Sequence, residues 1–132
     1  MSQYFKAGDR YLWNPSNGAA VMFQRQVALY EAELDLPSGI EPMQDNDEAR
    51  IDLVVFETFV NALVTRYAGM NHTVIHALSE GFAAMAVALA AHAGIRVDWA
   101  RPGPTPGTLP EGEAWAERVR EKARDLDRCM DR

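Results

Sequence analysis

The chain has 132 residues, the usual size of one domain and enough to bury a core without disulfides or a structural metal. Its formal net charge of −6 argues against a nucleic-acid partner, because phosphate binding relies on an excess of lysine and arginine. The single cysteine, Cys129, cannot form an intramolecular disulfide, and residues 1–6 do not resemble a secretory signal. Both observations favour a cytoplasmic location.

The first expected elements are two short strands within residues 3–13, where two aromatic runs flank a turn. Gly8 in this turn can supply the positive φ of a hairpin. Asn14 and Pro15 then suit the cap and the first position of a helix that runs to Leu34. Its apolar residues are spaced three and four apart, which predicts one buried stripe: Ala20, Phe23, Val27, Tyr30 and Leu34.

A second helix is expected to open at Asp47 or Asp52 and to end at Ala68, after an acidic loop. Its apolar residues form one broad face: Phe56, Phe59, Val60, Leu63, Val64 and Tyr67. Gly69 offers a left-handed cap, and Asn71 can cap a third helix two residues later. So short a link predicts that the second and third helices are antiparallel neighbours.

The third helix, residues 71–93, is expected to lie at the centre of the fold. Its predicted core stripe contains five apolar residues: Ile75, Leu78, Phe82, Met85 and Leu89. The remaining surface is largely alanine and could support self-association into a homo-oligomer through this helix. The most apolar stretch, from Phe82 to Ala93, is shorter than a membrane span, so no membrane partner is expected.

Residues 95–99 alternate apolar and charged side chains, which predicts a half-buried strand that pairs with the hairpin. Residues 101–112 are rich in proline and glycine and indicate a linker. A last helix over residues 113–131 should bury one side: Trp115, Val119, Ala123, Leu126 and Met130. The sequence therefore predicts one mainly α (α+β) domain over 1–132, with a core over 1–100, a four-helix arrangement and a small antiparallel sheet.

His72, His76 and Glu80 are spaced four apart and resemble, in outline, a metal or acid–base cluster. His76 and Glu80 are expected opposite the apolar stripe, in solvent, and no HExxH motif accompanies them. They are therefore weak metal candidates, and no cofactor is expected. No GxSxG, Cys/His or phosphate-loop motif is present either, so the sequence offers no catalytic residues and leans away from an enzyme.

Nine acidic residues stand between Glu31 and Glu57 against Arg50 alone, so this region should carry a negative field. The run from Asp45 to Glu48 does not continue as a calcium-binding EF-hand loop. The first functional hypothesis is a non-catalytic interaction protein of the immunity, antitoxin or accessory type. Its basic protein partner would meet four acidic residues: Glu41, Asp45, Asp47 and Glu48.

The alternative is a small-molecule-binding protein or small enzyme with a pocket beside the N-terminal aromatic residues. Tyr11, Trp13 and Asn14 would line that pocket, because binding pockets combine apolar walls with a few polar groups.

Three segments resemble an uncharacterised family of small actinobacterial proteins, catalogued as a domain of unknown function: LWNPSNGA (12–19), LPSG (36–39) and ALSEGF (77–82). The resemblance covers residues 3 to about 95. It implies a bacterial cytoplasmic protein, and it carries no activity or site residue that could be transferred.

Overall fold

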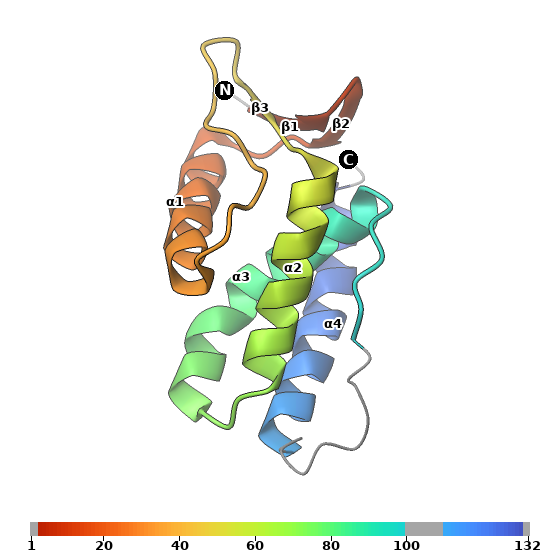
Figure 1. The fold of residues 1–132 in the computed structure, drawn as a ribbon. Helices are drawn as coiled ribbons and strands as arrows, with labels where there is room; N and C mark the ends of the chain where they lie inside the picture. Colours follow the sequence, from red (N-terminus) through yellow and green to blue (C-terminus); the bar gives the residue numbers. More distant parts are fainter. Residues whose placement is uncertain (1–2, 100–109, 131–132) are drawn as a thin grey trace.

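The computed structural model describes residues 3–99 and 110–130. These residues form three short strands and four helices (Figure 1) in the order β1 (Tyr4–Ala7), β2 (Arg10–Trp13), α1 (Asn17–Leu34), β3 (Glu48–Arg50), α2 (Leu53–Ala68), α3 (Thr73–His92) and α4 (Pro110–Met130). The sheet lies at one end of the helices, and α1 stands to one side of the other three. The α+β fold class is confirmed.

The sheet has the strand order β2-β1-β3 and is mixed. β1 and β2 form the expected antiparallel hairpin, with Gly8 at a φ of 59° in its turn. β3 comes from the acidic loop and pairs parallel to β1, with Phe5 opposite Ala49. The inward-facing Ala49 is fully buried, which fixes this short strand on the core side.

The prediction of a strand over residues 95–99 is wrong. This segment is extended but packs beside the helices, where the Asp98 amide donates to Asn61 Oδ1 at 2.7 Å. The guanidinium of Arg120 lies 4.8 Å from the centre of the Trp99 ring. Alternation of apolar and charged residues indicates an extended chain with one buried side, and here helices rather than a sheet cover that side.

The cap of α1 is Ser16 rather than Asn14, because the Ser16 hydroxyl accepts a hydrogen bond from the Ala19 amide. The helix ends at Asp35, which adopts a left-handed conformation with a φ of 54°. The predicted stripe of α1 is confirmed from Ala20 to Tyr30, and Leu34 is half-buried.

Asp52 caps α2, and its Oδ1 accepts from the amides of Val54 and Val55. All six residues of the predicted face of α2 are buried. Two details of the next turn differ from expectation. Gly69 is right-handed, with a φ of −83°, and His72 rather than Asn71 caps α3, through Nδ1 and the Ile75 amide.

The central helix is α3, which packs against α2 and α4. Its alanine face is buried within the same chain, and this face therefore is not a free surface for self-association: Ala83, Ala84, Ala86, Ala88 and Ala90. Among the described residues, α3 alone is long and apolar enough to span a membrane, and 56% of that stretch is buried inside the fold. Core helices of globular domains share these properties.

α4 begins at Pro110, three residues before the expected start, and residues 101–109 of the predicted linker lie outside the described residues. Trp115, Val119, Ala123 and Met130 are buried as predicted, and Leu126 is half-buried. Gly112 lies against the carbonyl oxygen of Ala68 and lets the start of α4 approach the end of α2.

Candidate interaction site

An apolar groove lies between α1 and α3. Its floor is aromatic, because the ring of Phe82 stacks on Tyr30 at 4.4 Å between centroids and on Phe23 at 5.7 Å. These large side chains bridge the two helices and hold the α1 backbone away from α3. The Tyr30 hydroxyl donates to the Leu78 carbonyl, at 3.4 Å, across the same floor. Burial raises the pKa of Tyr30, so this hydroxyl keeps its proton at neutral pH.

The groove consists of two hollows with volumes of about 370 and 440 Å³ that share Gln26 and Leu78. Both are lined mainly by apolar side chains. The first reaches the far end of α1: Leu29, Tyr30, Glu33, Arg66, Tyr67, Met70, Ile75 and Ser79. The second reaches the hairpin: Trp13, Ala19, Met22, Phe23, Ala77, Gly81, Phe82 and Met85. We call the two hollows together the α1–α3 groove.

Three large apolar side chains form the rim of this groove and project into solvent. Leu78 is 74% exposed, Met22 is 63% exposed and Leu29 is 54% exposed. The charged side chains that line the described groove, Glu33 and Arg66, lie at its far end, where Arg66 Nη1 donates to the Glu33 carbonyl at 2.6 Å. Exposed apolar side chains that gather into one patch beside a hollow are a feature of interaction surfaces and ligand-binding grooves.

The orientation of α3 reverses the prediction for two of its residues. Leu78 was expected in the core and is exposed, whereas His76 was expected in solvent and is 2% exposed. His76 Nε2 lies 2.7 Å from the Tyr67 carbonyl oxygen, and its ring stacks on Trp115 with centroids 5.6 Å apart. The neighbouring Ser79 is also buried and donates to the Ile75 carbonyl.

α4 fixes this orientation through Glu80. The Glu80 carboxylate accepts from Arg118 Nε at 2.6 Å and from Lys122 Nζ at 2.9 Å, both on α4. The hydrogen bond from Arg118 holds the pKa of Glu80 below its ordinary value, and Lys122 acts in the same direction. These contacts turn the His76 and Glu80 side of α3 toward α4, so the Leu78 side faces the groove.

Replacing Glu80 with glutamine should lower the free energy of unfolding by about 1 kcal/mol at neutral pH. The folded-state pKa of Glu80 lies below its ordinary value of 4.5, so its contribution is complete above that pH and is lost as the pH falls through the folded-state pKa. Urea unfolding followed by circular dichroism should therefore show a shallower loss of stability below about pH 4.5 in Glu80→Gln than in the wild type. The exposed Glu113→Gln serves as a control on α4, and equal acid sensitivity in both variants would contradict this role of Glu80.

The weak metal candidates do not form a common site. His72 is exposed and caps α3, His76 is buried against Trp115, and Glu80 pairs with the cations of α4. Over residues 3–99 and 110–130, no group of three His, Cys, Asp or Glu side chains could hold a metal ion.

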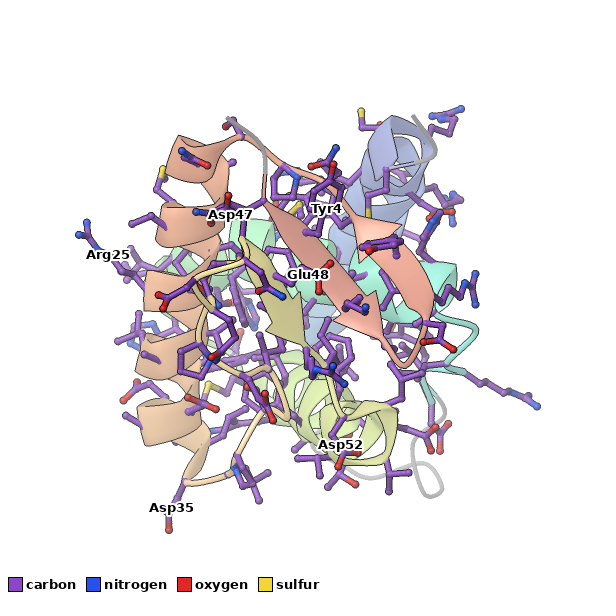
Figure 2. The ribbon with its side chains drawn as sticks, turned by 90° about the horizontal axis from the view of Figure 1, so that it is seen from above. Tyr4, Arg25, Asp35, Asp47, Glu48 and Asp52 are labelled. Atoms are coloured by element: carbon purple, nitrogen blue, oxygen red, sulfur yellow. The ribbon has the colours of Figure 1, made fainter. Side chains whose placement is uncertain are left out.

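The acidic residues lie on the loop between α1 and β3 and on β3 itself. Glu41 and Asp45 are exposed, and Asp47 is half-buried with a φ of 61°. Glu48 is already engaged, since it lies 3.6 Å from Lys6 Nζ and accepts from the Tyr11 hydroxyl at 2.9 Å. Figure 2 shows Asp47 at the start of β3, on the side of the sheet nearer to α1, and Glu48 farther from α1 over the sheet. This loop passes between α1 and α2 (Figure 1), whereas the groove lies between α1 and α3.

The three candidate pocket residues separate in the structure. Trp13 lines the groove and stacks on Phe5 at 5.3 Å between ring centroids. Tyr11 lies on the outer side of the hairpin beside Tyr4 and Lys6, and hydrogen bonding to Glu48 raises its pKa. Asn14 is exposed and lines neither hollow of the groove.

The domain that contains the groove matches a known protein family. A family model described as "Family of unknown function (DUF6086)" matches residues 1–132. The chain belongs to the DUF6086 family. Comparisons with curated proteins and with solved structures give no match.

In this DUF6086 member, sequence reasoning assigned only Trp13 of the groove lining to a pocket and missed, among others, Met22, Gln26, Leu29 and Leu78. A signal was present for two of them. Met22 and Leu29 are large apolar residues that fall outside the buried stripe of α1, and an amphipathic helix normally carries polar residues there. In α1, these two residues outside the core stripe lie on the rim of the groove.

Proposed function

We propose that this DUF6086 protein is a non-catalytic interaction protein, of the immunity, antitoxin or accessory type, and that its docking site is the α1–α3 groove. The observation that carries the proposal is the exposure of Met22, Leu29 and Leu78 around an aromatic floor. Burying these side chains in a complex would contribute about 25 cal/mol for each Å² of apolar surface removed from water.

The shape of the groove favours a helical segment of a protein partner. It extends along α1 from Ala19 to Glu33, a span of 15 residues that corresponds to about 22 Å of helix. An amphipathic helix of four turns could lay its apolar face into such a groove. Gln26, at the junction of the two hollows, supplies a polar group near the middle of the groove.

The acidic loop adds an electrostatic component to the proposal. Glu41, Asp45 and Asp47 would attract basic residues of the partner that reach past α1 to its α2 side. Glu48 contributes less, because its charge is paired with Lys6. Attraction of this kind weakens with salt, whereas apolar docking in the groove does not.

A display library of helical peptides tests the docking site without knowledge of the natural partner. Peptides enriched on the wild-type protein should carry apolar residues at helical spacing. They should lose binding to Leu78→Glu and keep binding to Val54→Glu, which changes an exposed valine of α2 that is 80% exposed and lies outside the groove. Enrichment of no peptide, or of peptides that bind both variants equally, would contradict the proposal.

A small apolar ligand in the hollow beside Trp13 is the second candidate. The observation that favours it is the volume of about 440 Å³ with an indole in its wall, a size suited to a small molecule. Apolar dyes that bind the wild type and Leu29→Glu equally, but not Trp13→Ala, would favour this candidate over a protein partner, because Leu29 lines only the other hollow.

We also propose a cytoplasmic location in an actinobacterium. The resemblance to small actinobacterial proteins and the single cysteine support it. Fractionation of the native host, followed by detection of the chain with an antibody, tests the location.

A further inference from the structure

The outward side of α3 carries no charge. Between Thr73 and His92 the helix has one acidic or basic residue besides histidine, Glu80, and that carboxylate is paired with Arg118 and Lys122 of α4. The side of α3 at the groove presents small and apolar residues instead: Ile75, Ala77, Leu78, Gly81 and Met85. In a chain with a net charge of −6, this is a surface where two copies could meet without placing like charges opposite each other.

The same surface contains both a projection and a recess. Leu78 projects between the two hollows that it helps to line, and Met22 and Leu29 project from α1 on the opposite rim. A twofold interface requires one patch that is complementary to itself, because each residue meets its partner patch in both directions. A projecting leucine beside apolar hollows meets this requirement, since each copy can insert its Leu78 into the groove of the other.

Gly81 allows the two backbones to approach. A Cβ atom added at Gly81 would meet no atom within 4 Å, so the space above this residue is open. Ala77 lies one turn earlier and also lines the groove. Small side chains at a helix crossing reduce the distance between helix axes toward the lower end of the usual 8–10 Å range.

We infer that the partner that occupies the α1–α3 groove is a second copy of this chain. The two copies would form a symmetric dimer through α3 and α1. The inference rests on the proposed function, because it names the partner of the same docking site. A standard interface takes roughly 800 Å² from each partner, about a tenth of the 7604 Å² surface of this chain. The acidic loops lie on the α2 side of α1 and stay free in such a dimer.

Two other occupants are less consistent with this surface. A membrane surface with anionic lipids favours a ring of lysine and arginine around an apolar face, and Arg66 is the one cation that lines the described groove. Glu33 and Arg66 are the charged side chains that line the described groove, and the acidic loop lies on the α2 side of α1, so charge within the groove does not select a basic partner. A second copy of the chain requires neither a ring of cations around the groove nor charged groups within it.

Sedimentation equilibrium of the full chain, from about 1 to about 300 µM and at low and high salt, tests the dimer. We expect a monomer–dimer equilibrium that high salt does not weaken. Leu78→Glu should raise the dissociation constant at least tenfold, or about 1.4 kcal/mol, and Val54→Glu should leave it unchanged. Met22→Glu, on the opposite rim, should raise the dissociation constant as Leu78→Glu does. It becomes the test variant if the Leu78→Glu protein does not fold.

A monomer at the highest concentration, or equal effects of Leu78→Glu and Val54→Glu, would overturn the dimer. Binding to vesicles of phosphatidylcholine and phosphatidylglycerol that Leu78→Glu abolishes, without self-association, would also overturn it in favour of a lipid surface. The proposed function has a separate readout. A monomer that still enriches helical peptides dependent on Leu78 contradicts the dimer alone, whereas a monomer that enriches none contradicts both.

Discussion

Replacing Phe82 with alanine should lower the free energy of unfolding by about 3–5 kcal/mol, the largest effect expected for a single side chain here. Phe82 is 3% exposed, and its ring contacts Phe23, Tyr30 and Phe59 from two other helices. Its removal leaves a cavity at the point where α1 is joined to α3. Urea unfolding followed by tryptophan fluorescence measures the change.

Leu78→Ala is the matched control for this variant, because Leu78 lies one turn earlier on the same helix and is 74% exposed. At protein concentrations that keep the chain monomeric, we expect a change within about 0.5 kcal/mol. Equal losses from Phe82→Ala and Leu78→Ala would show that both residues lie in the core and would contradict the exposure of the groove rim.

Gly112→Ala should destabilise the protein by about 3 kcal/mol through a steric mechanism. An added Cβ would lie 2.0 Å from the carbonyl oxygen of Ala68, a backbone atom of another helix, so α4 or α2 must shift. The shift would also disturb Trp115, which is fully buried three residues later. Thermal and urea unfolding of the variant, with near-ultraviolet circular dichroism as a probe of Trp115 packing, would record both effects.

The opposite result is expected for Gly81→Ala. This glycine also lies within a helix, but an added Cβ would meet nothing within 4 Å. Alanine is favoured over glycine in a helix interior by about 1 kcal/mol, so the variant should be more stable than the wild type. If Gly112→Ala were as stable as Gly81→Ala, the close approach of α4 to α2 would be wrong.

Elements with a single apolar side could be predicted from the sequence. In α2 every residue of the predicted face is buried, because Glu57, Thr58, Thr65 and Arg66 occupy much of the other side and favour one orientation. The hairpin was also predictable, since Gly8 marks its turn between two aromatic runs. These signals are local, and they do not depend on what packs against the element.

The face of α3 could not be predicted in the same way. This helix is apolar or alanine around most of its circumference, so periodicity alone does not select a buried side. The choice is made by α4, where Trp115 stacks on His76 and where Arg118 and Lys122 bind Glu80. Those partners lie more than 30 residues along the chain, beyond the reach of a local pattern.

The third strand was missed for a related reason. β3 is three residues long, reads Glu-Ala-Arg and carries one inward side chain, Ala49. A strand this short has no detectable alternation, and its parallel pairing with β1 is set by distant contacts such as the Ile51 amide donating to the Lys6 carbonyl. From the sequence alone, the same residues indicate an acidic loop that leads into α2.

The most direct test of the exposed docking surface is the rate at which a maleimide labels Leu78→Cys in a Cys129→Ser background. We predict labelling as fast as that of an unfolded chain at low protein concentration, slower labelling at high concentration, and strong protection of His76→Cys throughout. Protection of Leu78→Cys at low concentration, together with fast labelling of His76→Cys, would show that α3 has the opposite orientation and that the α1–α3 groove is not a docking site.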